Sequence, residues 1–321
     1  MKADGMLAVH LHSGAISVQQ AAIPSRLPGY ALIRLLTAGI CNTDLELQRG
    51  YYGFTGRPGH EFVGVVVESD TGSLAGARVA GDINLACGKC EFCAVGLGRH
   101  CSNRTVLGIV RHPGAFAEYL TLPDVNLHVL PDSISNKEAV FIEPLAAACE
   151  ILDQVVIPQN APAAVLGDGK LGLLIAQVLH AHGAKVTLYG RHPEKLRIAE
   201  GTGVQTSLAR DLPRESFPYV VESTGSAEGL QQAIGMTRPR GTVVMKSTVH
   251  GNVSFDAAPA IVNEITLVGS RCGRFEPAIE LLRTRKLDVL SMLSAEFPLS
   301  EAPEAFAEAG RRGVLKVLLQ N

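Results

Sequence analysis

The chain has 321 residues, 46% of them hydrophobic, and a formal net charge of -2. That length suggests two domains with substantial cores, and the near-neutral charge argues against nucleic acid as the main partner. No apolar run reaches membrane-spanning length, and the first residues lack the apolar core of a signal peptide. Four of the seven cysteines form one cluster, which indicates metal ligands in a reducing compartment rather than disulfides. We therefore expect a cytoplasmic protein without nucleic-acid or membrane partners.

The first part of the chain is predicted to be rich in β-strands. From residue 6 to about residue 37 apolar and polar residues alternate between proline and glycine breaks, and residues 62–68, 114–119 and 127–130 continue this pattern. Cys41 and His60 lie at the ends of expected strands. Each alone is more often structural, but thiolate and imidazole are ligands that zinc prefers, so together they are a candidate metal site.

Four cysteines follow with the spacing C-x2-C-x2-C-x7-C: Cys87, Cys90, Cys93 and Cys101. Four thiolates so close together would repel one another without a cation. Sulfurs at about 2.3 Å complete a tetrahedral zinc and leave no open position, which is typical of a structural site. An iron–sulfur cluster also takes four cysteines and is the alternative.

A helix with a proline break is predicted over residues 135–155. Ser135 is the expected N-cap, with Glu138 closing a capping box. Pro144 is expected to interrupt the helix, which resumes from residue 145. Glu143 lies beside that proline in an otherwise apolar patch. Because unpaired burial of a carboxylate is costly, Glu143 is a candidate metal ligand or active-site residue.

Residues 163–191 have the order strand, glycine turn, helix, strand, which is typical of the first unit of a dinucleotide-binding fold. In the turn, Gly167 allows a tight bend, Gly169 lets the backbone approach a pyrophosphate, and Gly172 lets the helix pack close to the strand. Lys170 and Leu171 open the helix, whose N-terminus favours phosphate. These residues are the predicted cofactor site.

The end of the second strand of this unit indicates which dinucleotide binds. NAD-binding units usually have an acidic residue there, whereas this chain has Gly190, Arg191 and His192, with Lys195 shortly after. Gly190 is expected to leave room for a 2′-phosphate, and Arg191 can bind it through charge-assisted hydrogen bonds. We therefore predict NADP(H) rather than NAD(H). The alternative is that Arg191 is a solvated surface residue in an ordinary turn.

The remaining segments extend a parallel sheet. Strands are expected at residues 219–222, 241–246 and 265–269, with helices at 227–236 and 277–285. The tail, helical over 302–311 and extended over 314–319, has no glycine-rich loop and is expected to return to the first domain. The predicted domains are residues 1–145 with 288–321, and residues 146–287.

The motifs GICNTD, GHE, the four-cysteine lobe, EPL and GDGKLG occur here in the order found in the medium-chain, zinc-dependent alcohol dehydrogenases, which the whole chain resembles. That family includes sorbitol, threonine and glucose dehydrogenases. The resemblance implies an α/β fold, with a Rossmann doubly wound parallel sheet and a GroES-like β-barrel catalytic domain. It also implies two zinc ions per chain, one catalytic and one structural, and a homodimer or homotetramer joined near residues 265–269.

The resemblance also assigns roles to the residues that match these motifs. Cys41, His60 and Glu143 match the catalytic zinc ligands, with Glu61 as a carboxylate that can join or leave them. Thr43 matches the hydroxyl that passes the substrate proton toward the cofactor ribose. Glu46 stands where many relatives have the outer histidine of this proton relay. The implied reaction is hydride transfer between NADP(H) and a secondary alcohol, polyol or sugar, or the matching carbonyl.

Two other functions fit parts of the sequence. One is a zinc-free reductase of conjugated carbonyls on the same scaffold, and the other is a dinucleotide-binding sensor or scaffold with only a structural zinc. Relatives of the first kind generally lack the Cys41 and His60 pair, and the second has no use for it. Two zinc ions per chain support the dehydrogenase, and one supports either alternative.

Overall fold

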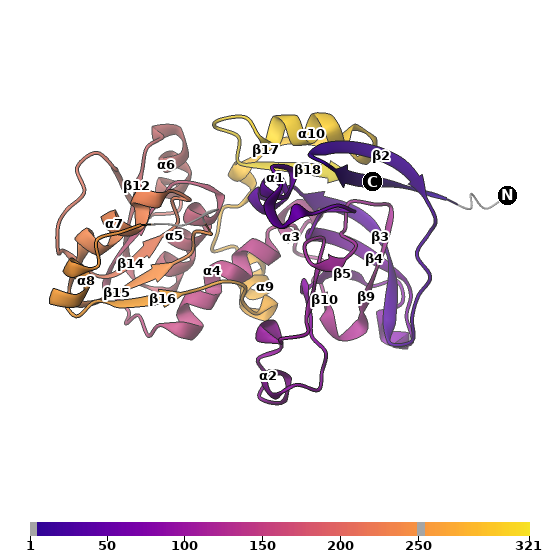
Figure 1. The fold of residues 1–321 in the computed structure, drawn as a ribbon, viewed down its shortest axis with the longest axis horizontal. Helices are drawn as coiled ribbons and strands as arrows, with labels where there is room; N and C mark the ends of the chain where they lie inside the picture. The colour runs from indigo at the N-terminus through magenta and orange to yellow at the C-terminus, as the bar shows by residue number, and fades with distance from the viewer. Residues whose placement is uncertain (1–4, 249–253) are drawn as a thin grey trace. The chain divides into compact units, whose positions relative to one another are not determined.

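The computed structural model describes residues 5–248 and 254–321, and the chain divides into two compact units (Figure 1). Unit 1 comprises Met1–Glu143 and Leu293–Asn321, and unit 2 comprises Pro144–Met292. None of the helices in the described residues combines the length and apolarity needed to cross a bilayer.

Unit 1 is built around β3 (Tyr30–Gly39), whose alternating side chains face its core. Within the described residues its main sheet has the order β10-β5-β4-β3-β18-β17, and β9 also pairs with β3. Strands β1 and β2 form a hairpin, and β6, β7 and β8 form a small sheet. The other strand bounds are β1 (Met6–His12), β2 (Ala15–Ala21), β4 (Glu61–Glu68), β5 (Arg78–Gly81), β6 (Asn84–Leu85), β7 (Thr105–Leu107), β8 (Arg111–His112), β9 (Tyr119–Pro123), β10 (Leu127–Val129), β17 (Leu293–Pro298) and β18 (Lys316–Gln320).

The helices of unit 1 in the described residues are short and lie between its strands along the chain. They are α1 (Asn42–Gln48), α2 (Glu91–Ala94), α3 (Asn136–Ala139) and α10 (Ala302–Ala309), with 3-10 turns η1 (Tyr51–Gly53), η2 (Gly72–Leu74), η3 (Gly98–His100), η4 (Asp124–Asn126) and η6 (Leu299–Glu301). The capping box expected at Ser135 is present. The Ser135 N–H donates to Glu138 Oε2 at 2.8 Å, and the Glu138 N–H donates to Ser135 Oγ at 3.3 Å.

The expected helix break at Pro144 is wrong. Helix α4 (Ile142–Gln154) begins two residues before the proline and continues through it. Pro144 lies in the first helical turn, where a backbone N–H has no intrahelical acceptor, so its missing donor costs nothing there.

Unit 2 is a parallel sheet with helices packed on it. Within the described residues its strand order is β13-β12-β11-β14-β15-β16, and every neighbouring pair is parallel. This is the strand order of a doubly wound dinucleotide-binding fold. The bounds are β11 (Pro162–Leu166), α5 (Lys170–His182), β12 (Lys185–Gly190), α6 (Pro193–Glu200), β13 (Gln205–Leu208), β14 (Phe217–Glu222), α7 (Ala227–Met236), β15 (Thr237–Met245), α8 (Ala258–Val262), β16 (Thr266–Gly269), α9 (Phe275–Arg283) and η5 (Leu290–Met292).

Candidate active site

Cys41 lies at the junction where β3 ends and α1 begins. It is the N-cap of α1, and its backbone N–H donates to Asp44 Oδ2 at 2.9 Å. The hydroxyl of Thr43, in the first turn of the same helix, lies 3.7 Å from the Cys41 sulfur. The sequence motif CNTD is therefore a helix start that presents a thiol and a hydroxyl together.

His60 and Glu61 lie where the chain enters β4. Gly59, just before them, has φ of +100°, and a Cβ there would come within 2.4 Å of the Phe116 ring. Only glycine fits both conditions, so the turn fixes where the imidazole points. The His60 side chain is 3% exposed, and its Nδ1 lies 3.4 Å from Asp44 Oδ1 without a hydrogen-bond partner among the described residues.

Asp44 is a site residue that the sequence reasoning missed. It is fully buried and connects the two loops, because its carboxylate accepts the backbone N–H groups of Cys41 and, at 3.1 Å, of Gly59. A histidine that binds a metal usually has its second ring nitrogen beside a carboxylate, which fixes the ring and raises its basicity. Asp44 has that position toward His60.

The ligand atoms of Cys41, His60 and Glu61 all lie within 4.8 Å of one another. A thiolate, an imidazole and a carboxylate are the donor set that zinc accepts. Burial alone would lower the pKa of His60, but the charges of Asp44 and Cys41 reverse this and leave its pKa well above the usual value. The negative charges that raise this pKa would also attract a metal cation. These residues therefore fit a metal ion.

Glu61 has a buried partner that the sequence reasoning also missed. The Lys316 ammonium, on β18, forms an ion pair with Glu61, and each side chain is 1% exposed. Lys316 also lies over the Phe141 ring, 5.4 Å from its centroid. Burial lowers the pKa of Lys316, but the Glu61 carboxylate opposes this, and the net direction is upward. A single lysine in an apolar strand was the available signal, because a buried ammonium needs an anionic partner.

Glu143 is the second residue of α4 and is half-buried. It is not one of the three residues whose ligand atoms lie within 4.8 Å of one another. Burial raises the pKa of Glu143 to about 7, Glu61 and Asp82 raise it further, and the positive charges of His60 and Lys316 oppose the rise. The side chain is therefore within electrostatic reach of His60 and Glu61.

Glu46, the candidate for the outer end of the proton relay, lies on α1. Its carboxylate accepts a hydrogen bond from Arg49 at 2.6 Å, and both side chains are partly exposed. Because the Glu46 side chain is partly exposed, water can reach its carboxylate.

The four cysteines of the lobe converge on one point. The ligand sulfurs of Cys87, Cys90, Cys93 and Cys101 all lie within 4.8 Å of one another, and none forms a disulfide. The Cys90 sulfur lies 3.4 Å from that of Cys93 and 3.6 Å from that of Cys101. Zinc–sulfur bonds of about 2.3 Å give a tetrahedron with edges of about 3.8 Å, so this arrangement fits zinc.

Two cysteines of the lobe have pKa values that are shifted in opposite directions. Backbone N–H donors, that of Lys89 first, lower the pKa of Cys87 to about 6. Burial and the neighbouring sulfurs raise the pKa of Cys93 to about 11. Zinc binds cysteine as the thiolate, so a bound zinc would favour the ionised form of these sulfurs.

The glycine turn of unit 2 has the geometry that was expected of each glycine. Gly167 has φ of +118°, and a Cβ on Gly172 would lie 1.9 Å from the Gly167 carbonyl oxygen. Gly169 is the N-cap of α5. No atom lies within 4 Å of the point that a Cβ on Gly169 would occupy, so its backbone is open to a ligand. Lys170 and Leu171 begin α5 behind it.

The structure brings the end of β12 against this turn. The Gly167 N–H donates to the Tyr189 carbonyl at 2.9 Å. Gly190 ends β12, Arg191 is exposed, and His192 caps α6. The expectation that Gly190 leaves open room is wrong, because the side chain of Asp168 fills that space. Lys195 follows in the first turn of α6 and is half-buried.

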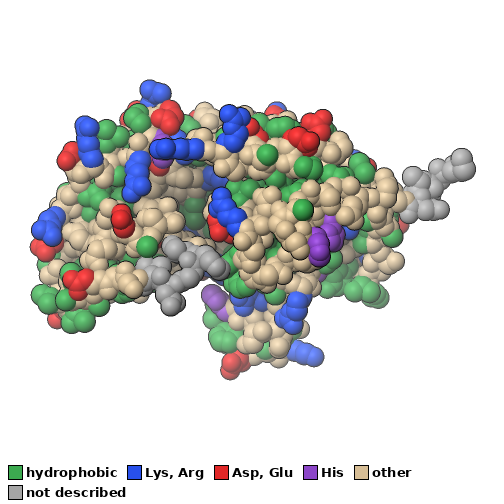
Figure 2. All heavy atoms as spheres, turned by 45° about the horizontal axis from the view of Figure 1, so that its top comes forward, with side chains coloured by type: hydrophobic (Ala, Val, Ile, Leu, Met, Phe, Trp, Pro, Cys, Tyr) green, Lys and Arg blue, Asp and Glu red, His purple; other side chains and the backbone are tan. Residues whose placement is uncertain are grey.

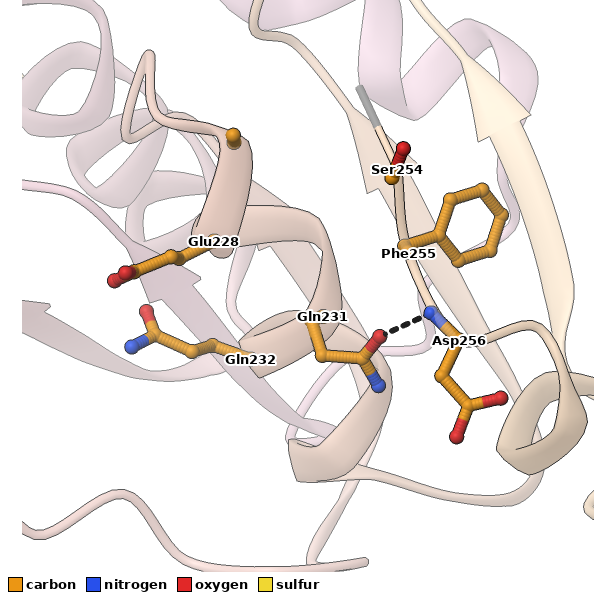
Figure 3. A pocket seen from close by; sticks show the side chains of 7 residues that line it. Glu228, Gln231, Gln232, Ser254, Phe255 and Asp256 are labelled. Atoms are coloured by element: carbon orange, nitrogen blue, oxygen red, sulfur yellow. Dashed lines mark hydrogen bonds between the residues drawn. The ribbon is translucent and has the colours of Figure 1, made fainter.

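A hollow of about 580 Å³ lies elsewhere on unit 2, between α7 and the segment before α8 (Figure 3). The Asp256 N–H donates to Gln231 Oε1 across it at 2.7 Å. Its lining residues are Ala227, Glu228, Gln231, Gln232, Ser254, Phe255 and Asp256. None of the predicted cofactor residues is among them.

Two family models match this chain, one in each unit. The family model of the alcohol dehydrogenase GroES-like domain covers residues 27–132, and that of the zinc-binding dehydrogenase covers residues 171–284. D-altritol 5-dehydrogenase of Agrobacterium fabrum is 33% identical, over 85% of this chain and 87% of its own. Sorbitol dehydrogenase of Halalkalibacterium halodurans is 28% identical over 96% of both chains. A zinc-binding dehydrogenase structure from Sinorhizobium meliloti 1021, bound to NADP, is 30% identical with a TM-score of 0.90, covering 99% of each chain.

The chain therefore belongs to the zinc-dependent medium-chain alcohol dehydrogenases. It is an oxidoreductase that acts on alcohols. The predicted family is confirmed, and so is the fold class, an α/β chain with a Rossmann-type parallel sheet and a GroES-like β-unit.

Proposed function

We propose that this chain transfers a hydride between NADP(H) and a polyol, sugar or other secondary alcohol, or the matching carbonyl compound. The observation that carries the proposal is the convergence of Cys41, His60 and Glu61 in unit 1 of a chain whose unit 2 has the glycine turn of a dinucleotide site. A binding protein or a zinc-free reductase has no need of such a donor group.

The catalytic zinc would be held by Cys41, His60 and one or both of Glu61 and Glu143. Bound zinc supplies Lewis-acid chemistry that lowers the pKa of an alcohol hydroxyl toward neutrality. The Asp44 carboxylate lies 3.4 Å from His60 Nδ1, and Lys316 forms an ion pair with Glu61. The four lobe cysteines would hold a second, structural zinc, which makes two ions per chain.

Proton movement is assigned to Thr43 and Glu46. The Thr43 hydroxyl, beside the Cys41 sulfur, accepts the substrate proton and passes on its own. Glu46, on the next turn of α1 and accessible to water, is the proposed outer acceptor. A bound nicotinamide would accept the hydride from the carbon that bears the deprotonated oxygen, and the alcohol would become the matching carbonyl compound.

The proposed cofactor site is the glycine turn with the end of β12. The backbone at Gly169 and the α5 N-terminus receive the pyrophosphate. Arg191, His192 and Lys195 favour the 2′-phosphate of NADP(H) over the 2′-hydroxyl of NAD(H). The NADP bound to the S. meliloti structure supports this preference.

Polyol substrates are supported by the names of the relatives, among them sorbitol, D-altritol and erythritol/L-threitol dehydrogenases.

A homodimer or homotetramer is supported by the edge position of β16 and by the exposed apolar side chains of Ile261 and Val262 on α8. On the face seen in Figure 2, basic and acidic side chains are interspersed, which does not favour nucleic acid as a partner. We propose that the enzyme works in the cytoplasm.

The test is nicotinamide reduction by purified, zinc-loaded protein, given NADP or NAD with a pooled panel of alcohols, polyols and sugars. We expect absorbance at the reduced-nicotinamide band with NADP and a polyol. A signal with NAD alone would contradict the NADP preference. Protein that carries two zinc ions but gives no signal with either cofactor would contradict the polyol assignment.

A further inference from the structure

A carboxylate lies at the end of β12, although the sequence has no acid there. In dinucleotide-binding units the acid that accepts the ribose 2′-hydroxyl usually stands at this strand end. An ideal Cβ on Gly190 would lie 2.5 Å from Asp168 Oδ2 and 2.7 Å from Asp168 Cγ. The Asp168 side chain, which comes from the glycine turn, therefore occupies the space of the strand-end side chain.

Asp168 is held firmly in that position. Its Oδ2 accepts the backbone N–H groups of Arg191 and His192, both at 2.7 Å, and the residue is 7% exposed. The His192 Nδ1 lies 3.1 Å from Oδ2 and 3.2 Å from Oδ1. A carboxylate oxygen accepts two hydrogen bonds, so Oδ1 keeps a lone pair for a ligand hydroxyl.

We propose that Asp168 is a selectivity residue that reads the 2′ position of the cofactor. The inference rests on the proposed function, because it requires a nicotinamide dinucleotide at this turn. A ribose 2′-hydroxyl can donate to Oδ1, whereas a 2′-phosphate is repelled by the carboxylate. Asp168 thus opposes Arg191 and Lys195, and it keeps the preference for NADP(H) below the level that the basic side chains alone would give.

Asp168→Asn tests this with the smallest change of shape. The amide keeps an oxygen for the two backbone N–H groups but loses the charge. We expect NADPH to bind about tenfold more tightly and NADH about tenfold more weakly. Dissociation constants come from fluorescence titration of the zinc-loaded enzyme with each reduced cofactor. If Asp168 only held the turn, both affinities would fall by the same factor, and that result would overturn the inference.

Three further variants keep the test decisive. Arg191→Ala should shift the affinity ratio the opposite way, toward NADH. Asp168→Ala with Gly190→Asp moves the acid to the strand end, and it should restore the wild-type ratio that Asp168→Ala alone loses. A double variant with the ratio of Asp168→Ala would overturn the inference. Wild-type enzyme that binds neither cofactor would overturn the proposed function as well, whereas normal binding with an unchanged ratio in Asp168→Asn overturns the inference alone.

Discussion

The two candidate metal sites of unit 1 differ in how their ligands are distributed along the chain. The lobe takes four sulfurs from residues 87–101, and one short loop brings them together. The other site combines Cys41, His60 and Glu61 with supports as distant as Lys316. The first arrangement depends on local spacing, whereas the second depends on the sheet order that places β4 and β18 on either side of β3. A local site can be recognised from spacing alone, whereas the buried supports of a distributed site, here Asp44 and Lys316, become evident only from the fold.

The largest expected effect is on the distributed site. Cys41→Ala should lower turnover at least about 1000-fold, because the site without its thiolate no longer retains the zinc that activates the alcohol. Elemental analysis should find one zinc per chain instead of two, and NADPH affinity should change little. Turnover close to that of the wild type would rule out the zinc mechanism.

A smaller effect is expected from a change in Asp44, whose carboxylate lies beside His60. Asp44→Asn should weaken zinc binding at the distributed site 10- to 100-fold, because the imidazole loses its carboxylate partner. Competition with a chromogenic chelator measures this, and the lobe zinc should be unaffected. Glu46→Gln, on the same helix but partly exposed, is the matched control and should leave zinc affinity unchanged. Equal zinc retention in both variants would show that Asp44 does not support the site.

The smallest effect on turnover is expected from the lobe. Cys101→Ser removes a buried sulfur and should release the structural zinc, which lowers the thermal midpoint because a structural metal contributes to folding. Turnover per folded molecule should stay within about threefold of the wild type, since the lobe has no open position for substrate. A loss as large as that of Cys41→Ala would mean that the two sites are not separate in function.

Much of the fold was predictable because it depends on local signals. The alternating strands, the Ser135 capping box and the three glycine roles each follow from a few adjacent residues. The proline break at Pro144 failed, since a proline is tolerated in a first turn, and helix ends are poorly fixed by sequence.

The residues that were missed share one physical cause. Asp44, Asp168 and Lys316 are buried charged groups whose partners come from other elements. In the sequence, Asp44 is an acid at the start of a helix, and Asp168 stands between the first two glycines of the glycine motif. Lys316 is a lysine in an apolar run. Burial of each depends on tertiary packing, which no local pattern encodes. Of these three residues, a search for isolated charges inside apolar runs would have found only Lys316.

The position of β18 has a consequence for synthesis on the ribosome. Glu61 and Lys316 are 255 residues apart, and β18 lies inside the main sheet, beside β3. At about 5–20 residues per second, Glu61 is made roughly 13 to 50 s before its cation. All of unit 2 is translated in that interval and can fold first. The nascent chain can therefore acquire its nucleotide-binding half while the half that carries the chemistry still lacks a central strand.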